Sequence, residues 1–294
     1  MEGTMIEKRK IKTTILFLLP SLLLIFVFFA LPVFVTIFYS FTNKTLVGVK
    51  AINWDFVGIE NYKFMFADKR FFISLKNTIV FLFFSALVGQ QVLGFALAYM
   101  MQKKNALLRR FVGTSVLLGW VTPEVVVSFI FFAFLNTEGS LNSFLGVFNI
   151  KPIAWLFDHA MLAIIFANIW RGTAFSMLIF QSALGNVSES VKESARIDGA
   201  NTRQVLFRII IPLISGSIVT NTILITLQTI GLFGLIYALT GGGPGYDTTT
   251  VPIYMYNKAF SAYQLGYGTA MAIILVLFGM LMSVFYMRSF KRND

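Results

Sequence analysis

Long apolar runs are the feature of this sequence that most restricts its fold. A helix needs about 20 consecutive apolar residues to cross the hydrocarbon core of a membrane, and six runs are long enough. We predict spans at 14–40, 75–101, 112–135, 160–184, 208–240 and 266–288. The composition agrees, because 57% of the 294 residues are hydrophobic and only 13% are charged, too few for a soluble domain. The sequence therefore predicts an all-α integral membrane protein with six transmembrane helices.

The distribution of lysine and arginine predicts how these spans are oriented. Most of the 24 Lys and Arg residues lie in four segments: the N-terminal tail, the 102–111 loop, the 185–208 loop and the C-terminal tail. Cytoplasmic loops are enriched in Lys and Arg, so we expect these four segments, and both termini, in the cytoplasm. The net charge of +11 is then largely a topology signal rather than a sign of nucleic-acid binding.

The predicted organisation is a single transmembrane domain between two short tails. The tails are cytoplasmic and cover 1–13 and 289–294, and the domain covers 14–288. The first span is too long for the apolar part of a signal peptide, and no small-residue cleavage site follows it, so we expect it to be retained.

The 185–208 loop carries signals for a short helix. Asn186 followed by Glu189, and Ser190 followed by Glu193, are both spaced as capping boxes, and either pair could start the helix. The loop continues as ESARIDGANTRQVLFRIIIPLI from Glu193 onwards. We therefore predict a helix, a turn and a second helix that leads into the fifth span.

The turn is placed at Asp198-Gly199, because glycine tolerates the backbone geometry that ends a helix. Around it, Ala195, Ile197 and Ala200 are expected to form a small apolar surface that a partner could grip. From the residues alone, a solvated connector is an equally good reading of this loop.

Two charged residues lie inside predicted spans, where charge is costly and usually functional. Glu124 follows a proline in the third span, and Arg171 is near the middle of the fourth. Because these spans run antiparallel, both charges are expected at a similar depth. They could pair with each other, or Arg171 could bind an anionic or hydroxyl-rich substrate with Glu124 tuning it. The two readings do not exclude each other.

Several classes of function are disfavoured by what the sequence lacks. It has no cysteine and one histidine, His159, so we expect no metal site and no catalytic centre. It has no G-x-x-x-x-G-K-[ST] phosphate loop, so ATP chemistry would have to come from another chain. An ion-coupled secondary transporter that uses Glu124 and Arg171 is the main alternative to an ATP-driven one.

Three stretches resemble the permeases of binding-protein-dependent ABC importers. The segment ESARIDGA, followed by IIIP, is similar to their EAA loop, with Ser194 and Ile211 where the family usually has Ala and Leu. Two further segments resemble the maltose-type sugar permeases in particular: FVGIENYKFMFADKRFFISLKNTIVF (56–81) and LIYALTGGGPGYDTTTVPIYMYNKAF (235–260). The resemblance extends from 56 to the C-terminus and implies the architecture of a type I ABC importer permease.

The resemblance also implies partners. The 185–208 loop would dock on one of two cytosolic ATPase subunits, which carry the ATP and Mg, while this chain binds no cofactor and is not an enzyme. A second, different permease would complete the path, and a substrate-binding protein would dock outside, near 241–247. The setting implied is a bacterial plasma membrane. The ATPase-coupling residues would be Glu193, Ser194, Ala195, Asp198, Gly199 and Ala200.

The substrate site implied by the resemblance lies on the fourth and fifth spans. Arg171 is not the usual residue at its position, and Ile225 and Leu232 replace polar residues, so an acidic sugar is favoured over a neutral maltose-like one. A uronate-containing oligosaccharide, sialic acid or a glycerol phosphate would fit. The candidate substrate-binding residues are Glu124, Trp170, Arg171, Gly172, Phe175, Gln228, Thr229 and Leu232, with Ile225 on the same face.

For four polar residues of these two spans we expect a structural role. Asn168, Asn221, Gln228 and Tyr237 are expected to form hydrogen bonds between helices more readily than to substrate. The function predicted from the sequence is thus a sugar-importer permease subunit that is moved by separate ATPases.

Overall fold

The structure is a computed structural model that describes residues 17–102 and 104–291, without the side chains of 289–291. The predicted tail 1–13, the first residues of the first span and 292–294 lie outside the described residues. Within the described residues, regular structure is helical, apart from one isolated antiparallel bridge between Thr42 and Phe56. The predicted all-α fold is therefore confirmed.

Five stretches of helix are long and apolar enough to cross a membrane, and a sixth is bent. The five are Phe17–Ser40, Lys69–Met101, Glu124–Gly146, Ala160–Gly185 and Leu265–Arg288. The sixth combines Thr202–Leu213 with Ser215–Ile230, which meet at an angle of 68°. This is a multi-pass membrane protein, as the apolar runs predicted.

The chain divides into two compact units, and each is described by itself. Unit 1 combines the described part of 1–67 with Met255–Ile274, and unit 2 combines Asp68–Tyr254 with the described part of 275–294. The long helix α17 (Leu265–Lys291) contributes to both.

Unit 1 contains the first span, which consists of residues from Phe17 followed by η1 (Phe26–Ala30) and α2 (Leu31–Ser40), and the short α3 (Glu60–Ala67). None of the most apolar part of this span is buried within the chain, so its apolar side chains are available to lipid or to another subunit. Two side chains tie α3 to the end of α2. Asn61 Nδ2 donates to the carbonyl oxygen of Ser40 at 2.9 Å, and the Tyr62 hydroxyl contacts Ser40 Oγ at 2.8 Å.

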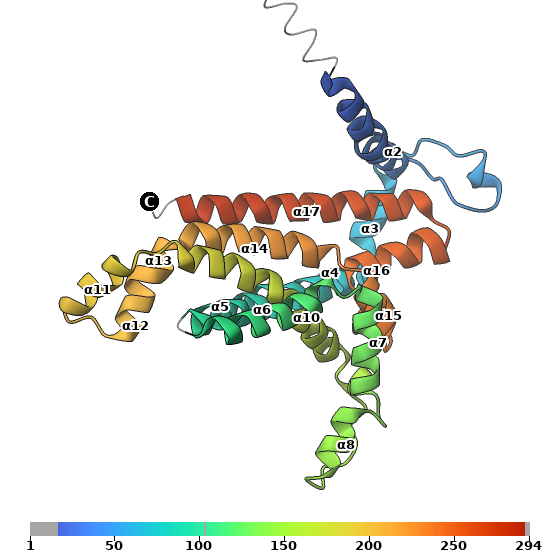
Figure 1. Ribbon diagram of the computed structural model, residues 1–294. Helices are drawn as coiled ribbons and strands as arrows, with labels where there is room; N and C mark the ends of the chain where they lie inside the picture. The colour runs from blue at the N-terminus through green and yellow to red at the C-terminus, as the bar shows by residue number, and fades with distance from the viewer. Residues whose placement is uncertain (1–16, 103, 292–294) are drawn as a thin grey trace, which may run out of the picture. The chain divides into compact units, whose positions relative to one another are not determined.

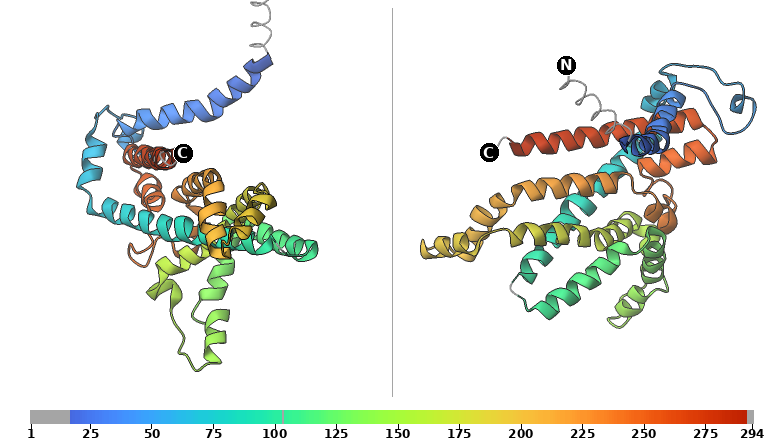
Figure 2. Two further views of the ribbon diagram at one scale, coloured as in Figure 1. Left: turned by 90° about the vertical axis from the view of Figure 1, so that its left-hand side faces the viewer. Right: turned by 45° about the horizontal axis from the view of Figure 1, so that its top comes forward.

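Unit 2 is built around α10 (Ala160–Gly185), which lies among the other helices of the bundle (Figures 1 and 2). A second long helix packs along it, consisting of α4 (Lys69–Phe81), the π-helical η3 (Leu82–Gln90) and α5 (Gln91–Met101). Gly94 of α5 lies directly against Ser176 of α10, where a Cβ would collide. A small residue thus permits the close approach of these two helices.

Two predicted spans are interrupted, so the expectation of continuous helices there was wrong. The third consists of α6 (Ala106–Val121) and α7 (Glu124–Leu135), separated by an extended Thr122 and Pro123. Proline lacks an N–H and disfavours helical geometry in the residue before it, which explains the break. The fifth is interrupted twice. Its start, in η4 (Leu206–Ile210) and α13 (Ile211–Leu213), meets α14 (Ser215–Ile230) at the 68° bend, and α15 (Gly234–Thr240) follows α14 after a second break.

The remaining elements are short. They are η2 (Val49–Ala51), α8 (Ser140–Gly146), α9 (Trp155–Asp158), α11 (Glu189–Ile197), α12 (Thr202–Val205), η4 (Leu206–Ile210), α13 (Ile211–Leu213), α16 (Val251–Tyr256) and η5 (Asn257–Ser261).

Candidate functional site: an intramembrane ion pair and a coupling segment

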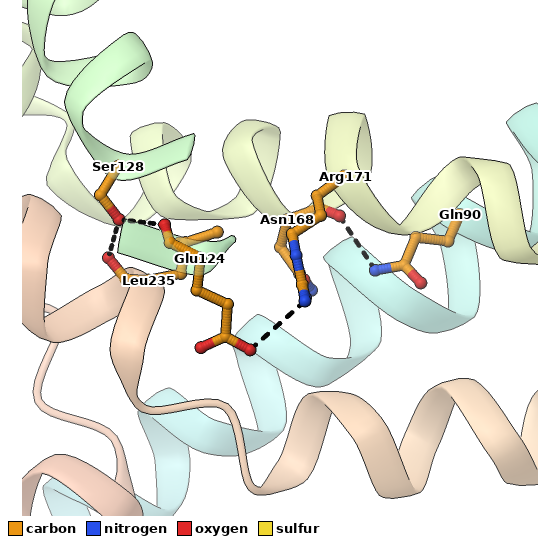
Figure 3. A network of polar contacts seen from close by, with 6 residues as sticks. All are labelled: Gln90, Glu124, Ser128, Asn168, Arg171 and Leu235. Carbon is orange, nitrogen blue, oxygen red and sulfur yellow. Dashed lines mark hydrogen bonds and ion pairs between the residues drawn. The ribbon is translucent and has the colours of Figure 1, made fainter. Parts of the chain in front are cut away.

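The two charges inside the bundle face each other in unit 2. Arg171 lies in the middle of α10, and Glu124 is the first residue of α7, immediately after the break at Pro123. Arg171 Nη2 lies 3.5 Å from Glu124 Oε1, and their side chains are 23% and 32% exposed (Figure 3). Of the two readings that the sequence left open, the ion pair is present. Both side chains are partly exposed, so pairing does not exclude contact with a substrate.

Glu124 is positioned by the ends of two broken helices. It occupies the first turn of α7, where the helix dipole favours a negative charge. Ser128 Oγ contacts the carbonyl oxygens of both Glu124 and Leu235, at 2.9 and 3.0 Å, and so joins α7 to α15. A Cβ on Gly234 would lie 2.6 Å from Glu124 Oε2, so glycine is what allows the carboxylate to approach α15. Sequence reasoning missed both Ser128 and Gly234.

Arg171 is positioned by amide side chains that hold α10 against the η3 helix. Asn168 Nδ2 donates to Ser85 Oγ at 2.8 Å, and Gln90 Nε2 donates to the carbonyl oxygen of Asn168 at 3.1 Å (Figure 3 shows the latter). The amide of Gln90 occupies the space beside Gly172 in which a Cβ would lie. The structure therefore gives Gly172 a packing role, and the structural role predicted for Asn168 is confirmed.

The guanidinium of Arg171 is incompletely satisfied. Its Nε is buried and has no hydrogen-bond partner. The 3.5 Å contact with Glu124 is longer than the roughly 2.7–2.9 Å of a strong charge-assisted hydrogen bond. Arg171 therefore retains donor capacity that Glu124 does not use.

Aromatic side chains flank the arginine. Trp170 is 47% exposed and packs edge-on against Phe131, with 5.9 Å between ring centroids. Phe175, one turn further along α10, stacks on Trp120 of α6 at 5.8 Å. Trp170 and Phe175 were both predicted as site residues, whereas Trp120 was not.

The candidates from the fifth span are mostly turned toward other helices. Ile225, Thr229 and Leu232 are buried, Leu232 in an apolar cluster with Leu235, while Gln228 is exposed. Their predicted contact with substrate stays a prediction.

Two further polar residues of the fifth span, Asn221 and Tyr237, also differ in burial. Asn221 has the helix-bridging role predicted for it, because its Nδ2 donates to Gln91 and, at 3.0 Å, to Ser176 Oγ. Tyr237 is partly exposed, and its ring stacks on Phe233.

A coupling segment, defined as α11, the turn after it and α12, lies at one end of unit 2 (Figure 1). The predicted helix–turn–helix is present, but its starting signals were misread. The N-cap is Ser188, with no side-chain cap bond, and the capping box belongs to α12. There, Asn201 and Gln204 exchange hydrogen bonds at 2.8 and 2.9 Å. The same capping spacing recurs at several positions in this loop, so spacing alone did not choose among them.

The turn forms at the predicted position and has a Schellman geometry. Gly199 has a φ of +87°, which glycine adopts without steric cost. Its N–H donates to the carbonyl oxygen of Arg196, and the N–H of Ala200 donates to that of Ala195, at 3.1 and 2.9 Å. These bonds satisfy the carbonyl groups at the end of α11.

The apolar surface predicted on this segment was partly wrong. Ala195 is only 9% exposed and packs inward with a cluster that includes Phe180 and Val205, while Ala200 packs against the edge of that cluster. Ile197 is 85% exposed. The inward face of α11 therefore fixes it to the bundle, because Ala195 is small enough to sit flat on the underlying helices. The outward face carries Glu193, Ser194, Ile197, Asp198 and Gly199.

A glycine-rich loop, 241–247, is held against α4. Three glycines of 241–245 have positive φ. The Thr249 hydroxyl bonds the carbonyl oxygen of Gly242 at 2.7 Å, and Asn77 of α4 donates to that of Tyr246, also at 2.7 Å. The loop is thus a well-bonded structure rather than a loose connection.

Comparison with known proteins gives this geometry a context. The family described as binding-protein-dependent transport system inner membrane components matches residues 90–293. A multiple sugar-binding transport system permease protein of Streptococcus mutans is 34% identical, over 95% of each chain. A sulfoquinovosyl glycerol transport system permease protein of Agrobacterium fabrum is 30% identical, over 95% of this chain and 91% of the relative.

A solved structure has the same fold. It is a bacterial ABC transporter involved in the import of the acidic polysaccharide alginate. It superposes with a TM-score of 0.80 at 20% sequence identity, over 99% of both chains.

Proposed function

Since this chain belongs to the family of binding-protein-dependent transport system inner membrane components, we propose that it forms half of the translocation path of an ATP-driven sugar importer. The observation that carries the proposal is the full-length similarity to sugar permeases at 30% identity or more. The shared length includes both the ion-pair region and the coupling segment, so the proposal concerns the whole chain.

We propose that the coupling segment binds a cytosolic ATPase subunit through its outward face. That face presents two carboxylates, Glu193 and Asp198, beside the exposed Ile197. The inward face is fixed to α10 and α5 by buried apolar contacts of Ala195 and Val205. A displacement of α11 would therefore pass into the bundle instead of being absorbed by a loose loop.

Further subunits would complete the transporter. They are a second, different permease, two ATPases that bind ATP and Mg, and a substrate-binding protein that docks near the 241–247 loop. The lysine and arginine distribution supports an orientation with both termini in the cytoplasm of a bacterial cell.

For the substrate, we propose a sugar that carries an acidic group. The side chain of Arg171 is partly exposed, and its single contact with Glu124 is a long one of 3.5 Å, so the guanidinium has donors left for a substrate. Arginine holds a carboxylate or phosphate through two parallel hydrogen bonds. The exposed ring of Trp170 is next to it on α10 and could cover the apolar face of a sugar ring. The acidic group would then compete with Glu124 for the guanidinium.

The test is ATP hydrolysis and sugar uptake by the assembled complex in liposomes with its binding protein. Neutral and acidic oligosaccharides are compared for the wild type, Arg171→Ala and Arg171→Lys. We expect acidic sugars to stimulate turnover and Arg171→Ala to abolish the stimulation, with Arg171→Lys recovering part of it because lysine keeps the charge without the two-pronged geometry. Arg110→Ala, which removes an exposed arginine of α6 outside the candidate substrate site, serves as the control.

The outcomes separate the readings. Stimulation by neutral sugars alone, with Arg171→Ala only lowering thermal stability, would leave Arg171 as a structural partner of Glu124. Uptake that follows an ion gradient without ATP would replace the proposal with a secondary transporter.

A further inference from the structure

A cavity of about 880 Å³ lies in unit 2 beside the coupling segment and apart from the ion-pair region. Its walls come from the ends of α5 and α10, the first turn of α6, and α11 and α12. Three cationic side chains line it: Arg109 of α6, and Lys192 and Arg196 of α11. A single carboxylate, Glu189, lines it as well. The cavity is thus cationic, although no part of the predicted function uses it.

The charged side chains that line this cavity are mainly cationic. Lys192 is buried and contacts Glu189 Oε1 at 2.9 Å, so the only lining carboxylate is already engaged. Within the described residues, neither Arg109 nor Arg196 forms an ion pair. Both arginines are exposed, whereas the one lining carboxylate is paired with Lys192, so the cavity carries an excess of positive charge.

We propose that this cavity binds a phosphate group, held between Arg109 and Arg196. A phosphate supplies several acceptor oxygens and the missing negative charge, and arginine is well suited to it. Two sources share this chemistry: the headgroup of an anionic phospholipid and a soluble phosphate ion.

The position of the cavity favours the lipid source. It lies at the end of the bundle where the helices leave the predicted membrane region, and Tyr99 and Met100 line it together with Arg109. Tyrosine is typical of the headgroup level, and basic pockets between transmembrane helices bind anionic headgroups.

A phosphate in this place would bridge α6 and α11. Arg109 belongs to a membrane helix and Arg196 to the coupling segment, so the ligand would strengthen the attachment of α11 to the bundle. The binding does not depend on what the transporter carries. Only the effect on coupling rests on the proposed function.

The test uses the full complex with its partner permease and ATPases, in nanodiscs of phosphatidylcholine with or without phosphatidylglycerol. Lipids retained after detergent extraction are counted by native mass spectrometry. The two cavity variants are Arg109→Gln and Arg196→Gln. The controls are Arg110→Gln and Arg208→Gln, exposed neighbours that do not line the cavity. In a parallel arm, inorganic phosphate is titrated while thermal stability is measured.

We expect the wild type to retain phosphatidylglycerol in preference to phosphatidylcholine. Arg109→Gln and Arg196→Gln should each lower that retention about tenfold, the scale of one charge-assisted contact, while the controls retain it. Phosphate that stabilises the wild type but not the two cavity variants would support the same site with a soluble ion as its source.

Equal loss in cavity variants and controls would overturn the proposal, because general surface charge would then explain it. So would the absence of both lipid preference and phosphate stabilisation. If Arg196→Gln disturbs ATPase docking, Arg109→Gln still decides, because Arg109 lies outside the coupling segment. If a cavity variant loses sugar transport but still retains phosphatidylglycerol, the result would count against the proposed effect of the lipid on coupling but not against the lipid site.

Discussion

Gly172 gives a sharp test of how α10 is held beside the η3 helix. In Gly172→Ala the new methyl group would occupy the space of the Gln90 amide, which is buried and bonded to the carbonyl oxygen of Asn168 at 3.1 Å. Either the helices separate or the amide leaves its site. The same change at Gly113 of α6, where a Cβ meets nothing within 4 Å, is the matched control.

The expected magnitude follows from three contributions. Overpacking costs about 1–3 kcal/mol, and the lost hydrogen bond about 0.6 kcal/mol, the average for membrane helices. Replacing glycine by alanine in a helix returns about 1 kcal/mol. We therefore expect Gly172→Ala to lower the free energy of unfolding by about 0.5–2.5 kcal/mol, and Gly113→Ala to leave it unchanged or raise it by up to about 1 kcal/mol.

The assay is reversible unfolding of the purified complex in mixed micelles, and a double-mutant cycle makes it specific. In a Gln90→Ala background the space beside Gly172 is empty, so Gly172→Ala should cost little or become stabilising. If Gly172→Ala is as harmless as Gly113→Ala, or if Gln90→Ala does not relieve its cost, the packing described for this contact is wrong.

Three further changes test the coupling segment and the broken helices. Gly199→Ala places a Cβ on a residue with φ +87° and should strain the turn by about 1–2 kcal/mol. We expect lower ATP-driven uptake, with sugar binding, measured by calorimetry, unchanged. An equal loss of sugar binding would contradict this. Ile197→Asp alters a side chain that is 85% exposed and should reduce co-purification of the ATPases without shifting the melting temperature of the permease pair, whereas Ala195→Asp, directed into the apolar cluster, should lower that temperature. Ser128→Ala removes the contact between α7 and α15 and should cost about 1 kcal/mol in the same unfolding assay, and no measurable change would show that the two helix ends are held by other contacts.

Several residues and segments that bear on function could be identified from the sequence alone. The charges at Glu124 and Arg171 attracted attention because charge inside an apolar span is expensive, and the turn at Gly199 because glycine alone tolerates its geometry easily. The predicted membership in the family of importer permeases was confirmed by the family match over 90–293. These signals depend only on residue type and spacing, so they can be recognised without knowledge of the fold.

Helix continuity and the facing of side chains were harder to predict. Apolar composition is the same on both sides of Pro123, so hydropathy alone joined α6 to α7. Ala195 was assigned to an exposed surface, because a small apolar residue in a charged helix is compatible with either face. Its burial follows only from the cluster beneath it.

The sequence by itself determined that the chain crosses a membrane several times, that Glu124 and Arg171 are unusual there, and that a charged loop turns at Gly199. These conclusions rest on residue type and spacing, whose energetic cost in lipid does not depend on neighbours. Only the tertiary structure decided that the two charges meet, that Gln90 fills the space beside Gly172, and that Arg109 and Arg196 share one cavity. Such contacts join residues far apart in the chain, and their geometry depends on how the helices pack.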